Sequence, residues 1–362
     1  MGEESSYVLW FEECDESSLP LVGGKNMSLG RMTTAGIPVP PGFAITTRAY
    51  EKFLTKGGIK KRIQEILAEV DPEEVSTVQK AGKAARQLTR STTVPDDVEQ
   101  AIKEAYEFLC KKCNLVALPV AVRSSATAED LPGASFAGQQ ETYLWVMGPN
   151  DVVESTRNCW ASLFTDRAIT YRIKMGFPHE QVLISVGVQK MVNARAAGVT
   201  FTLNLLTGDR SKITIDANWG LGESVVKGEV TPDNYLVDKV TFNISRRTIS
   251  PKTVEYVVER ETGKVVQSEV PPERQKEPCL NDEEVRELTR LAKLIEKYYD
   301  GKPQDIEWAV DQHLPFPENM LILQSRPETV WSQKERKPIV EPGKSVLDII
   351  LDTTMKGKKI KL

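Results

Sequence analysis

Three segments of the chain combine residue types that could bind phosphate groups or a metal ion. In the first, residues 22–26 (VGGKN), a glycine pair precedes Lys25 at the start of a predicted helix. Glycines let the backbone approach a ligand closely, and helix N-termini favour anions. A glycine pair before a helix is also a common turn, so this segment by itself leaves both phosphate binding and a simple turn open.

The second segment, residues 121–139 (AVRSSATAEDLPGASFAGQ), joins a predicted strand to a loop of small residues. The strand would deliver Arg123 to the loop, whose backbone N–H groups and hydroxyls suit phosphate oxygens. Arg123 could pair with the same oxygens through two hydrogen bonds. The alternative is a surface loop beside a solvated arginine. The length and the small-residue content of the segment favour phosphate binding.

The third segment is a pair of predicted strands, residues 305–311 and 320–326. Alternate side chains of a strand point to the same face, so Glu307 lies on a polar face and Gln324 shares a face with Arg326. If the strands pair, oxygens of Glu307 and Gln324 suit Mg²⁺, and Arg326 would neutralise charge on a transferring phosphoryl group. The alternative, which alternation alone favours, is an ordinary half-buried hairpin.

Composition argues against several classes of protein. Of the 362 residues, 40% are hydrophobic and 27% are charged, as in a globular protein with a core. The net charge of −4 argues against a general nucleic-acid binder. No apolar run approaches the about 20 residues that cross a bilayer, and the N-terminal residues lack a signal-peptide pattern. We therefore expect no nucleic-acid partner, no membrane association and a cytoplasmic location.

The five cysteines include a CxxC pair, Cys110 and Cys113, near the end of a predicted helix. A zinc site needs four ligands, and no second CxxC or nearby histidine completes a set. We expect buried or idle thiols rather than a metal site.

The elements that must position these segments alternate without regular βαβ order, which predicts an α+β fold with antiparallel sheet. A helical region is predicted over 59–113. Asn281 and Glu284 have the spacing of a capping box, which predicts a helix over 282–300. The other predicted helices are 25–36 and 151–176, and the other predicted strands are 42–46, 120–123, 141–146, 182–191 and 198–203, with a hairpin around 238–250.

Six segments together resemble a known family. They are GGKNMSLGRM, GIPVPPGFAIT, AVRSSATAEDLPGASFAGQQETYLWV, GLGESVVKGEVTPDNY, DIEWAVD and LILQSRPET. In this order, over about residues 10–332, they look like the N-terminal nucleotide-binding part of phosphoenolpyruvate synthases, to which pyruvate phosphate dikinases and rifampicin phosphotransferases are related. The resemblance implies an ATP-grasp fold with two lobes around ATP. It predicts a first lobe over 1–190 with a helical insert at about 59–113, a second lobe over 191–333 and a tail over 334–362.

The resemblance also implies roles for individual residues. Lys25 and Arg123 would contact the phosphates, and Arg326 would stabilise charge on the transferring group. Glu307 and Gln324 would bind Mg²⁺. The remaining implied ligands of ATP are a phosphate loop at Ser135 to Gln140 (Ser135, Gly138, Gln139 and Gln140), an adenine hinge at Gln189, Met191 and Val192, and Glu223, which would contact the ribose or a loop.

The family's phosphate-accepting histidine is not found in the sequence. His179 and His313 are the two histidines, and neither lies in a glycine- and threonine-rich motif. The chain is therefore either a fragment or a protein whose partner domains are separate polypeptides. We expect the second, a natural subunit of a multi-subunit, Mg²⁺-dependent dikinase that transfers the β-phosphoryl group of ATP to a histidine on a partner subunit, leaving AMP and phosphate. The partner would also bind most of the small-molecule acceptor.

The final acceptor is the most open expectation. The size and layout resemble the ATP-binding subunit of phenylphosphate synthase, which predicts phenol. The alternatives are a phosphoenolpyruvate synthase-like subunit that acts on pyruvate, a non-catalytic nucleotide-binding module and an ATP-grasp ligase.

Overall fold

The computed structural model describes residues 6–127, 141–259 and 262–331. The chain divides into two compact units, Met1–Pro327 and Glu328–Leu362, and the described helices and strands belong to the first. Helices and antiparallel strands are mixed along this unit, so the predicted α+β class is confirmed. Among the described residues, no helix is both long and apolar enough to cross a bilayer.

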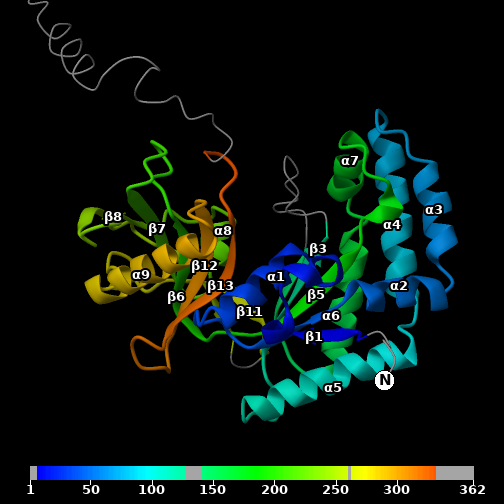
Figure 1. Ribbon diagram of the computed structural model, residues 1–362, viewed down its shortest axis with the longest axis horizontal. Coiled ribbons are helices and arrows are strands. Elements are labelled where there is room, and N and C mark those ends of the chain that lie inside the picture. Colours follow the sequence, from blue (N-terminus) through cyan, green and yellow to red (C-terminus); the bar gives the residue numbers. More distant parts are fainter. Residues whose placement is uncertain (1–5, 128–140, 260–261, 332–362) are drawn as a thin grey trace, which may run out of the picture. The chain divides into compact units, whose positions relative to one another are not determined.

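The first sheet has five antiparallel strands in the order β1-β2-β5-β3-β4 (Figure 1). Its central strand, β5, pairs with β2 on one side and β3 on the other. The strands are β1 (Val8–Trp10), β2 (Gly42–Ile45), β3 (Val120–Ala126), β4 (Thr142–Val146) and β5 (Ile184–Lys190).

Helices accompany the first sheet and share its largest apolar core, in which Phe53 and Trp160 pack with ring centroids 4.7 Å apart. These are α2 (Thr47–Lys56), α3 (Lys60–Ala68), α4 (Val75–Ser91), α5 (Asp96–Lys112), α6 (Pro149–Ser162) and α7 (Asp166–Lys174). The helix α1 (Leu19–Thr34) contributes its buried apolar side chains to other clusters, and the short 3₁₀ helices are η1 (Phe11–Glu13), η2 (Glu16–Ser18) and η3 (His179–Gln181).

The single helix predicted over 151–176 is wrong, because the chain forms two helices, α6 and α7. The break contains neither glycine nor proline. Instead, the hydroxyl of Thr165 accepts a hydrogen bond from the N–H of Ala168 and caps α7. Arg86 of α4 donates to the carbonyl of Phe164 and to the carboxylate of Asp166. The break therefore depends on a contact with a distant helix.

The second sheet has six antiparallel strands in the order β13-β12-β6-β7-β8-β9. The capping box predicted at Asn281 and Glu284 is present at the start of α9 (Asp282–Tyr298), which packs on this sheet. The remaining elements are β6 (Ala194–Phe201), β7 (Lys212–Trp219), α8 (Glu223–Val226), β8 (Asp233–Asp238), β9 (Ile244–Thr248), β12 (Gln304–Asp311), β13 (Met320–Pro327) and a separate two-stranded ribbon, β10 (Val254–Val258) with β11 (Val265–Glu269).

The pair β12–β13 contains a β-bulge. Glu307 lies opposite Gln324, but the next residue, Trp308, lies opposite Ile322. Leu323 is therefore an extra residue on β13 that has no partner on β12. The side chains before it and after it alternate between the two faces of the sheet in opposite phase. Because of this shift, Gln324 lies on the same face of the sheet as Glu307, while Ile322 lies on the opposite face and packs in the core with Trp308.

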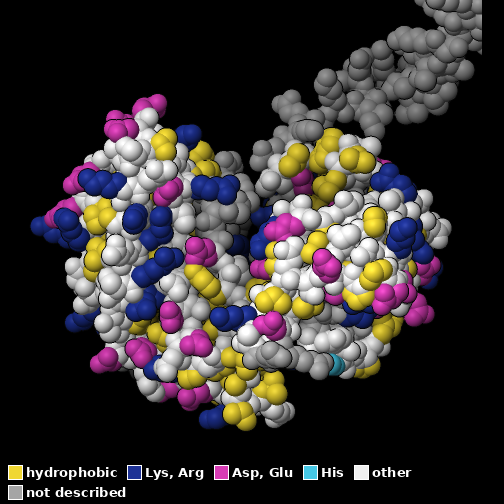
Figure 2. Space-filling view, turned by 180° about the vertical axis from the view of Figure 1, so that it is seen from behind, with side chains coloured by type: hydrophobic (Ala, Val, Ile, Leu, Met, Phe, Trp, Pro, Cys, Tyr) yellow, Lys and Arg dark blue, Asp and Glu magenta, His cyan; other side chains and the backbone are white. Residues whose placement is uncertain are grey.

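Charge is mixed over the surface seen in Figure 2. Lys and Arg side chains lie among Asp and Glu side chains there, without a broad basic field. The five cysteines are free, and Cys110 is buried at the end of α5. Among the described residues, no group of three or more His, Cys, Asp or Glu could hold a metal ion.

Candidate functional site

A cavity of about 470 Å³, the inter-sheet cavity, is lined by residues of both sheets. Thirteen residues were predicted for the site, and the nine that the structure describes all line this cavity. They are Lys25, Arg123, Gln189, Met191, Val192, Glu223, Glu307, Gln324 and Arg326. The other four, Ser135, Gly138, Gln139 and Gln140, lie outside the described residues.

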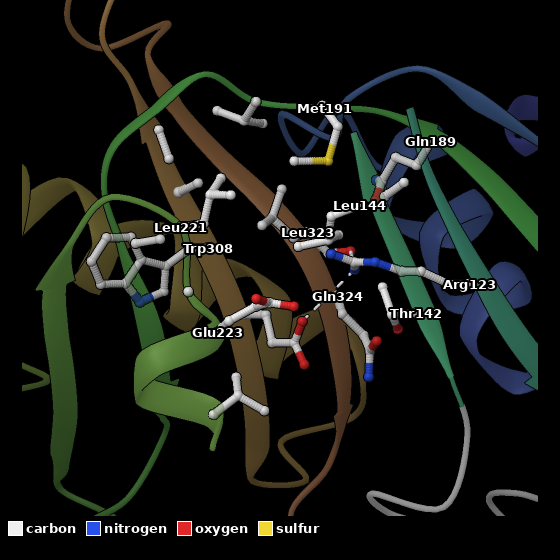
Figure 3. Close-up of a pocket in the computed structure, with 18 of the residues that line it drawn as sticks. Arg123, Thr142, Leu144, Gln189, Met191, Leu221, Glu223, Trp308, Leu323 and Gln324 are labelled. Atoms are coloured by element: carbon white, nitrogen blue, oxygen red, sulfur yellow. Dashed lines mark hydrogen bonds and ion pairs between the residues drawn. The ribbon is translucent and has the colours of Figure 1, made fainter. Parts of the chain in front are cut away.

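The side of the cavity that belongs to the first sheet supplies the predicted cations Lys25 and Arg123, together with Lys190 of β5. The Nζ of Lys25, on α1, lies 3.3 Å from the carbonyl oxygen of Ser124 on β3, to which it donates. Arg123 extends from β3 toward the second sheet (Figure 3). Its Nη1 lies 3.7 Å from Glu307 Oε2 and 3.5 Å from the carbonyl oxygen of Leu323, the bulge residue. Arg123 therefore links the two sheets across the cavity.

One N–H donor of the Arg123 guanidinium is not used by the described part of the chain. Its Nε is buried and has no hydrogen-bond partner within the part of the chain that the structure describes. Buried donors are normally satisfied, and one that is not is expected to meet a ligand, an ion or water. An acceptor oxygen brought into the cavity by a ligand would complete the set.

The side that belongs to the second sheet supplies oxygen ligands and a third predicted cation. Glu307 and Gln324 are direct neighbours across β12 and β13, as the alternation predicted. Nε and Nη2 of Arg326 donate to Oδ2 of Asp305, over 2.9 and 2.8 Å. This hydrogen-bonded pair holds the guanidinium of Arg326 against its own sheet, so its direction is fixed by the strand register.

One end of the cavity is apolar. Val192, Ala197 and Ala309 form a small buried cluster there, against which Leu321 and Leu323 pack. A flat apolar ring would be held by such a surface.

Backbone hydrogen bonds fix the hinge segment beside this apolar end. The N–H of Lys190 donates to the carbonyl of Pro41, and the N–H of Met191 donates to the carbonyl of Pro119. The Gln189 side chain is buried and donates to the carbonyl of Pro40 over 3.4 Å. These hydrogen bonds hold the segment in place on the first sheet without a bound ligand.

Glu223 begins the short helix α8 and pairs with Lys227 one turn later, over 3.7 Å. Lys227 also lies over the ring of Tyr256, 4.9 Å from its centroid. Sequence reasoning missed Lys227 as a cavity residue, although its i,i+4 spacing from Glu223 was a usable signal. It also missed Thr142 and Leu144, which no motif distinguished.

The glycine pair before Lys25 serves packing. Gly23 interrupts α1 with a φ of 70°, and a Cβ there would lie 2.4 Å from the carbonyl oxygen of Ser125. The close approach is thus between α1 and β3, and it brings Lys25 to the cavity. Both alternatives raised for this segment were incomplete, since the glycine neither faces open ligand space nor forms a simple surface turn.

Comparison with known proteins gives one family. Residues 19–345 match the family described as pyruvate phosphate dikinase, AMP/ATP-binding domain. The chain is 46% identical over 360 residues to a "Probable phosphoenolpyruvate synthase" of Staphylothermus marinus, covering 94% of this chain and 43% of that protein. It is 41% identical over 365 residues to a "Phosphoenolpyruvate synthase" of Pyrococcus furiosus, covering 91% and 44%. A "Phosphoenolpyruvate synthase" of Aeropyrum pernix is 42% identical over 366 residues, with 94% and 44% covered. The chain spans less than half the length of these relatives.

Proposed function

The chain belongs to the pyruvate phosphate dikinase AMP/ATP-binding domain family, and from that premise we propose that it binds ATP in the inter-sheet cavity and donates the β-phosphoryl group to a histidine. The observation that carries the proposal is the convergence of nine separately predicted residues on one cavity. They come from α1, β3, β5 and the segment that follows it, α8, β12 and β13.

The cavity suits a nucleotide because it combines an apolar cluster with several cationic side chains. Adenine would lie on the cluster of Val192, Ala197 and Ala309 beside the hinge. The phosphates would meet Lys25 and Arg123, whose Nε–H offers an unused donor. We propose that this arrangement is an ATP-grasp fold with the nucleotide between two lobes, and the lobe boundary near residue 190 is part of this proposal.

Glu307 and Gln324 fit Mg²⁺. Both offer hard oxygen atoms, and they are direct cross-strand neighbours. Mg²⁺ is commonly bound by one or two protein oxygens together with substrate phosphates, so a larger acidic cluster is not required. When bound, the ion would neutralise charge on the phosphate oxygens.

The residues of this chain would act by position and charge, since phosphoryl transfer needs little covalent chemistry from the protein. Arg326, held by Asp305, would face the transferring group with its charge in a fixed direction. Transfer to a histidine nitrogen breaks the bond between the α- and β-phosphates and leaves AMP. Water then releases the γ-phosphate as inorganic phosphate.

The accepting histidine would come from outside this sequence, whose two histidines are His179 and His313. His179 and His313 do not line the cavity. His179 accepts a hydrogen bond from Arg172, and His313 contacts Asn193. A separate histidine-bearing part, in the same or a partner chain, would therefore be needed, together with a part that binds the final acceptor.

Pyruvate is the better-supported final acceptor. The three relatives above are named as phosphoenolpyruvate synthases, which fits the alternative raised from the sequence. The expectation of phenol, from the likeness to phenylphosphate synthase, gains no support from them. We therefore propose a phosphoenolpyruvate synthase-like activity.

The test mixes the purified chain with Mg-ATP and candidate histidine-bearing proteins encoded beside it, then follows nucleotide products and acid-labile phosphohistidine. AMP together with phosphohistidine on the second protein is expected, and pyruvate should then discharge the phosphohistidine faster than phenol does. ADP as the sole product would overturn the proposal in favour of ligase or kinase chemistry. Tight ATP binding without turnover in any pairing would indicate a nucleotide-binding module.

A further inference from the structure

A second cavity, of about 240 Å³, lies beside the segment that leads into β5, at the end of that strand away from the hinge. It is called the helical cavity, because α2, α3 and residues 178–183 supply most of its wall. The wall is mainly apolar, with Leu54, Ile63 and Leu67 on the helices. It also carries two charged side chains, Glu51 and Lys60, of opposite sign. No residue lines both cavities, so a ligand of the helical cavity would bind independently of the proposed ATP site.

An arginine is buried behind this wall. Arg172, on α7, is 1% exposed, and its Nε donates to Nδ1 of His179 over 2.8 Å. A guanidinium can only donate, so Nδ1 must be the acceptor and a neutral imidazole must carry its proton on Nε2. Burial and the charge of Arg172 lower the pKa of His179 to about 4, so the ring is neutral near pH 7. His179 lines the cavity, and Nε2–H is the one donor that its neutral ring has left for a ligand.

The charge of Arg172 lacks compensation. Within the described residues, its Nη1 and Nη2 have no hydrogen-bond partner. Burial lowers the pKa of Arg172 to about 10. Its field also reaches another wall residue, because burial raises the pKa of Tyr50 and the guanidinium opposes that rise. A buried charge without a counter-ion is unfavourable, and an anion that reached it would be held.

We propose that the helical cavity binds a small aliphatic carboxylate. The carboxylate would accept the Nε2–H of His179, with Arg172 directly behind the ring, and the alkyl chain would lie against Leu54, Ile63 and Leu67. The cavity has about half the volume of the inter-sheet cavity and is smaller than the about 300–1,000 Å³ of typical drug-sized sites. It therefore fits a metabolite-sized anion rather than a nucleotide.

The experiment measures thermal unfolding and calorimetric binding of the full chain with straight-chain carboxylates of about four to ten carbons. Alcohols and amines of the same lengths serve as controls for the alkyl chain, and inorganic phosphate serves as a control for charge. A ligand that binds the folded state raises the unfolding temperature. We expect carboxylates to bind at least about tenfold more tightly than the matching alcohols, with one optimal length.

Two variants locate the site. Leu54→Trp fills the cavity without touching Arg172, and should weaken carboxylate binding at least about tenfold. Leu294→Trp, on α9 and 38% exposed, is the matched control and should bind as the wild type does. His179→Leu removes the donor, and should weaken carboxylates about tenfold while changing alcohol binding less than about threefold.

Three results would overturn the proposal. One is equal binding of carboxylates and alcohols, and another is unchanged carboxylate binding in Leu54→Trp. The third concerns Glu180, which follows His179 in the chain and whose side chain is not among those that the structure describes. If the wild type ignores carboxylates and Glu180→Gln binds them, the chain neutralises Arg172 with its own carboxylate.

Discussion

The inter-sheet cavity and the helical cavity lie near the two ends of β5, and they hold positive charge in different ways. In the inter-sheet cavity the cations face carboxylates, as in the pairs Arg123–Glu307 and Arg326–Asp305. In the helical cavity the described partner of Arg172 is a neutral imidazole. In these pairs a carboxylate already compensates each cation, so an incoming anion has to compete with it. A buried, uncompensated charge instead favours any small anion that reaches it.

The largest effect expected is at Arg326. Arg326→Ala should lower AMP formation about a hundredfold or more, because it removes a charge that is directed at the transferring group. Arg326→Lys is the control, and should lose less because it keeps the charge but not the two hydrogen bonds to Asp305. The measurement is the rate of AMP release with the histidine-bearing protein present. Near-normal turnover in Arg326→Ala would remove the arginine from the site.

Glu307 tests the other half of the cross-sheet pair. Glu307→Gln should raise the Mg²⁺ concentration for half-maximal AMP formation about tenfold, since an amide oxygen replaces a charged ligand. It also removes the carboxylate that faces Arg123 at 3.7 Å. Titration of activity with Mg²⁺ measures the effect, and an unaltered requirement would assign Glu307 to charge pairing alone.

The helical cavity should show itself in the pH dependence of stability. The pKa of His179 is lowered from 6.5 to about 4 in the folded chain, so the unfolded chain binds the extra proton between these values. This contribution to stability is complete above about pH 6.5 and is lost as the pH falls toward 4. His179→Leu should lose less stability than the wild type between pH 7 and pH 5, by on the order of 1–2 kcal/mol. Denaturant unfolding of both chains at the two pH values measures this difference, and identical losses would contradict it.

The smallest effect is expected at Lys227. Its side chain is 51% exposed and pairs with Glu223 on α8. Lys227→Met should weaken ATP binding about threefold and leave the free energy of unfolding within about 0.5 kcal/mol, because exposed ion pairs contribute little. Calorimetry and denaturant unfolding measure the two quantities. A large loss of stability would show that the half-exposed pairs of this cavity are structural.

The parts of the site that could be predicted were those with a local physical signal. Period-two alternation placed Glu307 and Gln324 on one face, and the strands pair as that pattern required. Capping chemistry located the start of α9 at Asn281. The resemblance to a family added the hinge residues, which no spacing alone distinguished. The phosphate loop at Ser135, Gly138, Gln139 and Gln140 stays a prediction.

The parts that could not be predicted depend on contacts between distant segments. The break between α6 and α7 contains no residue that disfavours a helix, and Arg86 stabilises it from another helix. The link from Arg172 to His179 joins a helix to a later 3₁₀ turn, and no periodicity describes it. His179 was expected to have an ordinary role for that reason.

The bulge at Leu323 has a consequence for how this region can vary in length. Its extra residue reverses the inward and outward phase of β13, so that Gln324 faces the cavity while Ile322 faces the core. Deleting Leu323 would rotate one half of the strand by half a turn, which would expose Met320 and Ile322 or bury Gln324 and Arg326. A one-residue deletion here would therefore move cavity residues to the core face of the sheet, or core residues to the cavity face. A one-residue deletion in the connection between β12 and β13 would alter only a loop.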